Sequence, residues 1–118
     1  MPREPKVYLR DILESIRKIE MYKARLNEIT FKEDELVQDG IIRNLEIIGE
    51  AVKKMPGSIK RESSKLDWRK IAGLRDVLIH CYYTVDLDIV WDIVQNKVPE
   101  LKAEVLAMMA HLDGQEEE

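Results

Sequence analysis

The sequence predicts an all-α protein, and three observations carry that prediction. Leucine, isoleucine, valine, glutamate and lysine dominate its 118 residues. Aromatic residues make up only 6% of the chain, whereas small β proteins are rich in aromatic and threonine side chains. Apolar residues recur at three- and four-residue steps along most of the chain, as they do on the buried face of a helix. We expect four helices with short links, forming an up-and-down bundle.

The length and composition predict a single helical domain over residues 1–118, with an acidic tail at about 113–118. A hydrophobic content of 45% is enough to bury a core. The only cysteine, Cys81, cannot form an intrachain disulfide or a cysteine-based zinc site. Because no cleavable signal or long apolar run is present, we expect a soluble cytoplasmic protein with a reduced thiol and no membrane contact.

Two helices are predicted in the first half of the chain. Residues 9–27 carry an apolar face opposite a charged one. Thr30 and Glu33 fit a capping box, so we expect the second helix to start there. Its apolar residues, up to Met55, cover more than one stripe, which predicts that this helix is the most buried element. Pro56-Gly57 should end it.

The third predicted helix follows a polar and basic link at residues 59–67, which a turn of helix could interrupt. Asp67 is placed to cap this helix at its start. One face of the helix combines apolar side chains with residues able to do chemistry: Trp68, Ile71, Leu74, Arg75, Leu78 and Tyr82.

The fourth predicted helix is capped by Thr84 or Asp86 and ends at Asp113-Gly114. Pro99 lies inside it. A proline ring clashes with the preceding turn and removes one backbone hydrogen bond, so we predict a kink near residues 95–98.

The net charge of −4 is unevenly distributed. Residues 53–75 carry eight lysines and arginines against two acids, while the rest of the chain is acidic. This basic segment could attract phosphate groups. A solvated loop between two helices would account for the same charges without any ligand.

The third predicted helix contains the pattern R-x4-H-x-Y, formed by Arg75, His80 and Tyr82. At about 100° per residue, Arg75 and Tyr82 lie within roughly 20° of each other on the helix, whereas His80 lies roughly 140° from Arg75. A straight helix cannot bring all three into one site. Either the helix bends, or a second copy of the chain completes the site and dimerisation is part of the mechanism.

An arginine and a histidine in one site could cleave RNA. Histidine, with a pKa near 6.5, exchanges protons at neutral pH, and a guanidinium holds a phosphate through two hydrogen bonds and stabilises charge in the transition state. Attack by the RNA's own 2′-hydroxyl needs no metal. Many helices, however, contain an arginine and a histidine by chance.

Other chemical roles for these residues fit less well. Neighbouring helical side chains diverge by about 100°, which disfavours a dyad of His80 and Cys81. His80 and His111 lie in different predicted helices and lack a convincing carboxylate partner for a metal. Glu46 and Glu50 could form a di-metal pair, but the first and fourth predicted helices show no matching E-x-x-H, so pairing on the surface or with a neighbouring helix is favoured. We therefore expect no metal and no cofactor.

Three motifs resemble the HepT toxins of the HEPN superfamily. The resemblance covers roughly residues 5–112, and the motifs occur in the family's order. They are Arg43-Asn44-Leu45-Glu46-Ile47-Ile48-Gly49-Glu50-Ala51, then Asp67-Trp68-Arg69-Lys70-Ile71-Ala72-Gly73-Leu74-Arg75-Asp76, and then Ile79-His80-Cys81-Tyr82. The resemblance implies a HEPN-like helical homodimer that acts as a metal-independent ribonuclease toxin of a type II toxin–antitoxin pair.

The resemblance also implies roles for single residues. Arg75 would bind phosphate, His80 would be the acid or base, and Tyr82 would receive AMP groups from a partner nucleotidyltransferase of the MNT type, which neutralises the toxin. The family often has asparagine after the arginine, whereas this chain has Asp76, an acidic residue in the cleft that lowers the local positive charge. An alternative hypothesis is a noncatalytic helical subunit that docks the nucleotidyltransferase and supplies Tyr82 as its substrate.

Overall fold

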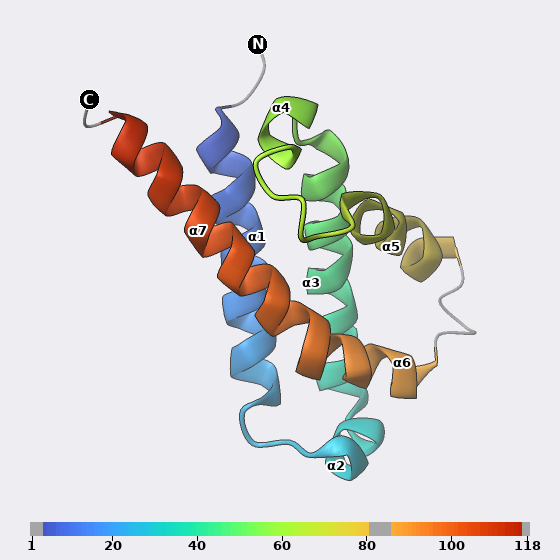
Figure 1. Ribbon diagram of the computed structural model, residues 1–118. Coiled ribbons are helices and arrows are strands. Elements are labelled where there is room, and N and C mark those ends of the chain that lie inside the picture. The colour runs from blue at the N-terminus through green and yellow to red at the C-terminus, as the bar shows by residue number, and fades with distance from the viewer. Residues whose placement is uncertain (1–3, 81–85, 117–118) are drawn as a thin grey trace.

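The computed structural model describes residues 4–80 and 86–116, and every regular element in those ranges is helical, which confirms the all-α prediction (Figure 1). The helices, in chain order, are α1 (Pro5–Lys23), α2 (Glu28–Glu33), α3 (Glu35–Lys54), α4 (Gly57–Lys60), α5 (Trp68–His80), α6 (Leu87–Asp92), the π-helix η2 (Ile93–Lys97) and α7 (Val98–Glu116).

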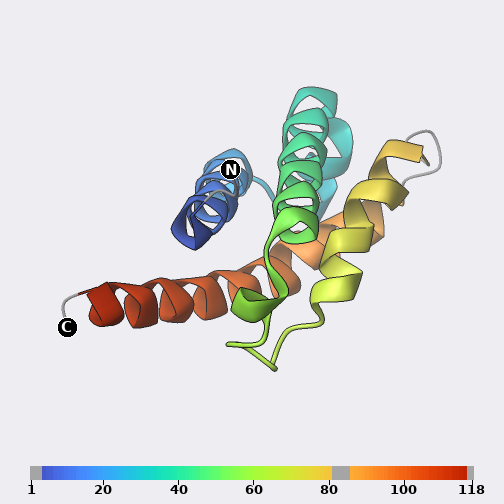
Figure 2. The ribbon, with the colours of Figure 1, turned by 90° about the horizontal axis from the view of Figure 1, so that it is seen from above.

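The long helix α3 lies between α1 and α5 and makes its most extensive contacts with these two helices. Figure 2 shows α5 running antiparallel to α3 on the side away from α1. Helix α7 runs diagonally across one face of α1 and α3 (Figure 1). The short helices α2 and α4 flank the two ends of α3 (Figure 1). Among the described residues, no helix has both the length and the apolar composition needed to cross a membrane.

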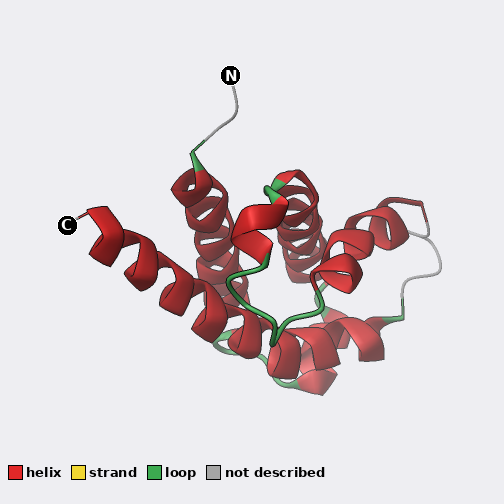
Figure 3. Cartoon of the chain, turned by 45° about the horizontal axis from the view of Figure 1, so that its top comes forward, coloured by secondary structure: helices red, strands yellow, loops and turns green. Residues whose placement is uncertain are grey.

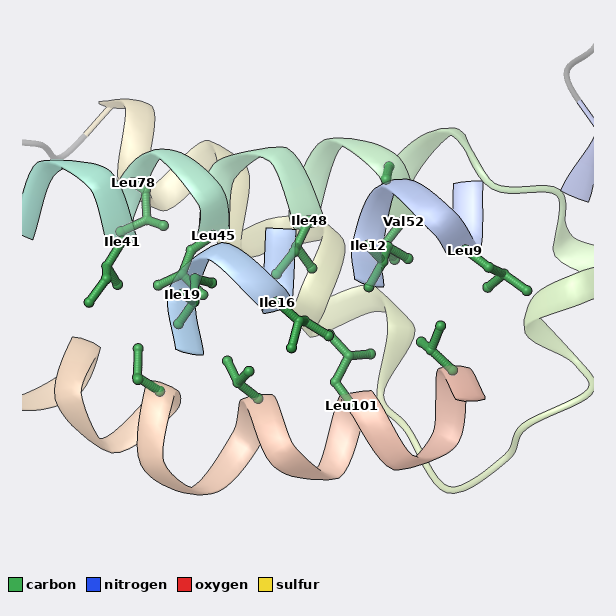
Figure 4. Close-up of a cluster of buried hydrophobic side chains, with 14 of the residues drawn as sticks. Leu9, Ile12, Ile16, Ile19, Ile41, Leu45, Ile48, Val52, Leu78 and Leu101 are labelled. Carbon is green, nitrogen blue, oxygen red and sulfur yellow. The ribbon is translucent and has the colours of Figure 1, made fainter. Parts of the chain in front are cut away.

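The core forms where α1, α3 and α7 meet, and α5 closes it from one side (Figure 4). Helix α3 contributes eight buried residues and α1 contributes six, which agrees with the expectation that the second predicted helix is the most buried. The side chains at the centre are aliphatic and nearly inaccessible to solvent: Leu9, Ile12, Ile16, Ile19, Ile41, Leu45, Ile48 and Val52.

The predicted capping box at Thr30 and Glu33 is wrong. The box lies one turn earlier, because the Asn27 side chain accepts a hydrogen bond from the Thr30 backbone N–H at 2.9 Å, and the Thr30 hydroxyl accepts one from the Asn27 N–H at 2.9 Å. It starts only the short helix α2. Asp34 then caps α3 by accepting from the Val37 N–H at 3.1 Å. In a capping box the residue at the third helical position is usually a glutamate or glutamine that accepts from the cap's backbone N–H. Here the Thr30 hydroxyl is that acceptor.

The fourth predicted helix is present but differs in form at Pro99 and at its end. Asp86 caps it, accepting from the Asp88 N–H at 2.8 Å, while Thr84 lies outside the described residues. The expected kink takes the form of η2, in which the Val98 N–H donates to the Ile93 carbonyl, five residues back. A wider turn before Pro99 accommodates the missing N–H. Helix α7 continues to Glu116, so the predicted end at Asp113-Gly114 is wrong.

The link between α4 and α5 passes between α5 and α7 (Figure 3). Hydrogen bonds attach it to both of these helices. The Trp68 indole N–H donates to the Ser63 carbonyl at 3.0 Å, and the buried Ser63 hydroxyl donates to Glu104 of α7 at 2.8 Å. Asp67 caps α5 as predicted, accepting from the Lys70 N–H at 3.1 Å. The helical turn expected in the link lies at its start, as α4.

Candidate active site

Helix α5 carries the arginine of the R-x4-H-x-Y pattern, and its position is set by a glycine of α3. A Cβ atom at Gly49 would lie 2.8 Å from the Arg75 backbone nitrogen, 2.9 Å from the Arg75 Cβ and 3.2 Å from the Ile71 carbonyl oxygen. Real Cβ atoms do not approach backbone this closely. The two helices are therefore in backbone contact at Arg75, and glycine is the residue type that permits it.

The Arg75 guanidinium is partly accessible, with 31% of the side chain exposed. Its Nη1 donates to the Asp76 carboxylate at 3.3 Å, and the Asp76 side chain is 50% exposed. A 3.3 Å contact between sequence neighbours is a weak ion pair in water. Solvent and a phosphate group can reach Arg75, but the phosphate must compete with Asp76.

A second carboxylate, Glu50 of α3, lies near Arg75. The pKa of Glu50 is lowered from its ordinary value of 4.5, first by a hydrogen bond from Lys54 and then by the charges of Lys54, Arg75 and Arg43. The Lys54 Nζ lies 3.0 Å from the Glu50 carboxylate. Glu50 is therefore ionised at neutral pH. Its carboxylate lies among the positive charges of Lys54, Arg75 and Arg43.

The prediction that Glu46 and Glu50 make ion pairs is supported. Glu46 lies 3.8 Å from the Arg43 guanidinium, and its side chain is only 16% exposed. Glu50 pairs with Lys54, as described above. Within residues 4–80 and 86–116, no three histidine, cysteine, aspartate or glutamate side chains cluster so as to hold a metal. Both glutamates are accounted for by pairs within α3.

The structure places only part of the predicted site. His80 is the last residue of α5, and its side chain lies outside the described part of the structure, as do Cys81 and Tyr82. The helix is α-helical from Trp68 to His80 without interruption. Over five residues of regular helix, Arg75 and His80 diverge by roughly 140°, as expected from the sequence.

The basic segment extends from the end of α3 to the start of α5. Its side chains are exposed at Lys53, Lys54, Arg61, Lys65, Arg69 and Lys70 and partly exposed at Lys60. Arg75 continues this series along α5. Exposed cations that follow one another along the chain in this way raise the local positive charge, which favours contact with anions.

A family model described as "Ribonuclease HepT-like" matches residues 12–108. The chain belongs to the ribonuclease HepT-like family. This match covers most of the chain, including α3, α5, the later part of α1 and the first part of α7. The resemblance identified from the three motifs is thereby confirmed at the level of the family.

HepT-like relatives in archaea are similar over most of this chain. A "Probable ribonuclease HepT" of Thermococcus cleftensis is 42% identical over 102 residues, covering 86% of this chain and 93% of that protein. A "Putative RNase" of Methanocaldococcus jannaschii is 38% identical over 118 residues, covering 99% and 98%.

A third HepT-like relative is longer than this chain. It is named "Gamma-glutamylcyclotransferase and putative RNase" and also comes from Methanocaldococcus jannaschii. It is 41% identical over 113 residues, which make up 96% of this chain but 51% of that protein. This chain thus spans about half of that relative's length. No solved structure matches the chain.

Two residues in the surroundings of Arg75 were not apparent from the sequence. Gly49 belongs to a quoted motif, but its contact with Arg75 depends on how α3 and α5 are aligned. Glu50 was weighed only as a metal ligand or an ion-pair partner, yet it lies within electrostatic range of Arg75. The signal available in the sequence was a glycine inside an otherwise strong helix, which often marks close helix packing.

Proposed function

We propose that this chain is a metal-independent endoribonuclease toxin of a type II toxin–antitoxin pair, acting in the cytoplasm as a homodimer. One observation carries the proposal most directly: Arg75 is accessible, held against Gly49, and located in the helix that ends at His80. Membership of the ribonuclease HepT-like family and relatives named as ribonucleases support the same activity.

In the proposed reaction, Arg75 holds a phosphodiester of RNA and stabilises the charge on its oxygens. The adjacent 2′-hydroxyl loses its proton to a base and attacks phosphorus, forming the 2′-O–P bond. The bond from phosphorus to the 5′-oxygen breaks, and an acid returns a proton to that oxygen. His80 serves as this base or acid, and the products are a 2′,3′-cyclic phosphate and a 5′-hydroxyl.

The homodimer is proposed because one copy of α5 does not supply a complete site. Arg75 lies on the side of α5 that meets α3, and His80 is roughly 140° further round an uninterrupted helix. A two-fold axis beside α5 would bring Arg75 of one copy toward His80 of the other. The basic segment would then flank the shared cleft.

The proposed antitoxin is a nucleotidyltransferase of the MNT type. The Tyr82 hydroxyl would attack the α-phosphate of ATP, forming a tyrosyl–AMP bond and releasing pyrophosphate. On a regular helix Tyr82 would share a face with Arg75, within roughly 20°. A bulky anion on Tyr82 would therefore repel RNA phosphate from the neighbourhood of Arg75.

Incubation of the purified protein with RNA in the presence of a metal chelator tests the proposal. Cleavage is expected to leave 2′,3′-cyclic phosphate ends. Arg75→Ala and His80→Ala are expected to lower the rate about 100-fold or more, since each removes a transition-state contact or a proton-transfer group. Circular dichroism checks that both variants remain folded.

Matched controls separate catalysis from general effects of charge. Arg17→Ala removes an exposed arginine of α1 that pairs with Glu14, and His111→Ala removes the exposed histidine of α7. Both control variants are expected to keep most of the activity. Cleavage that survives in folded Arg75→Ala and His80→Ala variants would sink the proposed site.

A second candidate function is a noncatalytic subunit that docks the nucleotidyltransferase and offers Tyr82 as its substrate. The contact between Arg75 and Asp76 favours it, because Asp76 offsets the charge that RNA cleavage would need. Mass spectrometry after incubation with the nucleotidyltransferase and ATP would then show AMP on Tyr82, absent in Tyr82→Phe. RNA would stay intact under every condition, whereas cleavage would exclude this candidate.

A further inference from the structure

A cavity of about 420 Å³ lies between α5, the link at residues 61–67 and the η2–α7 segment, and Arg75 does not line it. Figure 3 shows that link passing between α5 and α7. The floor is made of buried aliphatic side chains of α3 and α7, and the walls of half-buried ones. The walls are Leu66, Ile71, Leu74 and Ile93.

The cavity is open to solvent at one side, and its lining is mainly aliphatic. Given that one water occupies about 30 Å³ of liquid, this cavity offers on the order of a dozen methylene-sized volumes. Aliphatic walls give water few hydrogen bonds, so covering them with hydrocarbon is favourable. The interior of this cavity therefore suits a hydrocarbon chain.

The structure on both sides keeps the cavity open. One wall belongs to the π-helix η2, whose extra residue per turn is associated with Pro99. The opposite wall is the link at residues 61–67, which is tied to α7 through Ser63 and to α5 through Trp68. These two hydrogen bonds hold the link away from a collapse onto the floor.

The mouth of the cavity carries more usable positive than negative charge. Lys65, Lys70 and Lys97 lie at the rim, together with Asp67 and Glu100. Asp67 already caps α5, and Lys65 lies 3.6 Å from Glu104. Lys70 and Lys97 make no ion pair with any described residue, so the rim can receive an anion.

We propose that this cavity binds an anionic amphiphile, of the class of medium-chain fatty acids, with its tail among the wall residues and its head group at Lys70 and Lys97. A nucleotide fits the lining less well. No aromatic side chain lines the cavity for a base to stack on, and the floor and walls are hydrocarbon. Arg75 does not line this cavity, but Lys70 belongs both to its rim and to the basic segment. The proposal does not depend on ribonuclease activity.

Titration of dodecanoate into the full chain at low ionic strength tests the proposal. Calorimetry is expected to show saturable binding of one molecule per chain, below the concentration at which dodecanoate forms micelles. Methyl NMR shifts are expected at Ile71, Leu74 and Ile93, with little change at Ile29 and Leu36, two exposed residues outside the cavity. Absence of saturable binding, or shifts spread over all methyl groups, would overturn it.

Two sets of variants locate the ligand. Leu74→Trp fills the cavity and is expected to abolish binding, while Leu74→Met keeps the volume and should bind normally. Ile93→Phe fills the cavity from the other wall, in case Leu74→Trp fails to fold. Binding that persists in a folded, filled variant contradicts the site.

The head group is tested at the rim. Lys70→Gln and Lys97→Gln are each expected to weaken dodecanoate binding about two- to fivefold, the size of an exposed charge contact, while leaving dodecanol binding unchanged. Lys18→Gln, on α1 and outside the cavity, is the control. Equal losses for dodecanol and dodecanoate, or tighter binding of adenosine monophosphate than of dodecanoate, would overturn the assignment of the ligand class.

Discussion

At the scale of single residues, the contact between Arg75 and Asp76 determines how strongly the proposed site can attract a phosphate. The guanidinium that the proposed function needs for phosphate already contacts a carboxylate on the next residue, at 3.3 Å. Both side chains are exposed enough for water and salt to screen the contact. Asp76 therefore weakens the attraction between Arg75 and a phosphate but does not abolish it.

Asp76→Asn is expected to raise RNA cleavage about two- to fivefold at low salt, because it removes a negative charge beside Arg75 and keeps the side chain's shape. The ratio of variant to parent rate should fall toward one as salt is added. Initial cleavage rates at several salt concentrations measure this effect. Glu33→Gln, an exposed acid in α2, is the control, and a slower Asp76→Asn variant would show that the carboxylate assists the reaction.

Another residue pair joins α2 to α6 and responds to pH. Lys32 forms an ion pair with Asp88, whose pKa is lowered from its ordinary value of 3.8, first by the hydrogen bond from Lys32 and then by its charge. A carboxyl group whose pKa falls on folding stabilises the fold above its unfolded pKa, and that contribution is lost as the pH drops through the folded pKa. The pair is thus intact at neutral pH.

Carbon-detected NMR titration is expected to place the Asp88 midpoint below 3.8. Lys32→Met should move that midpoint up toward the ordinary value, because the hydrogen bond and the charge are both lost. Lys60→Met, on α4, should leave it unchanged. An Asp88 midpoint that does not respond to Lys32→Met would contradict the pair.

The crossing of α3 and α5 is the critical feature at the scale of secondary-structure elements. Gly49 lets the two backbones touch at Ile71 and Arg75. Because the atoms that a Cβ would meet belong largely to the backbone, no side-chain rearrangement can make room. A side chain at residue 49 must push α5 away and shift Arg75.

Gly49→Ala is expected to destabilise the protein by about 1–3 kcal/mol, as overpacking does, and to lower RNA cleavage. Gly73→Ala is the matched control, since nothing lies within 4 Å of a Cβ atom there. Replacing that helical glycine should be neutral or stabilise by up to about 1 kcal/mol. Urea denaturation measures both, and equal effects would show that contact at Gly49 is unimportant.

How far the sequence predicts each element depends on whether the controlling interaction is local. Asp67 and Asp86 were identified as caps because a cap acts within three residues of itself. Pro99 disturbed its helix where expected, since proline acts on the preceding turn. The second helix was started wrongly because Asn27 and Thr30 offered a competing cap one turn earlier. Two valid local patterns overlapped, and the structure uses the earlier one.

The site was less predictable because it depends on the pairing of distant helices. R-x4-H-x-Y was visible in the sequence as a local pattern. The contact of Gly49 with Arg75, the field of Glu50 and the cavity beside Ile71 require α3, α5 and η2 to be aligned in space. The pattern of residues along a single helix does not determine how that helix aligns with the others.

At the scale of the whole molecule, one chain provides a scaffold and half of a proposed site. Helix α5 lies at the edge of the group, packed mainly against α3, and carries an accessible Arg75 (Figure 2). Helix α5 is uninterrupted up to His80, and five residues of regular helix separate that position from Arg75 by roughly 140°. The central claim is therefore that two copies build each ribonuclease site.

Mixing the Arg75→Ala and His80→Ala variants under conditions that exchange subunits tests this claim most directly. A mixed dimer holds one site with both mutations and one site with an intact Arg75 and His80 from different copies. The mixture is predicted to regain about a quarter of the parent cleavage rate, since half of the dimers are mixed and each has one of two sites intact. A mixture that stays as inactive as its two components, while subunit exchange is verified by mass spectrometry, would contradict the shared site.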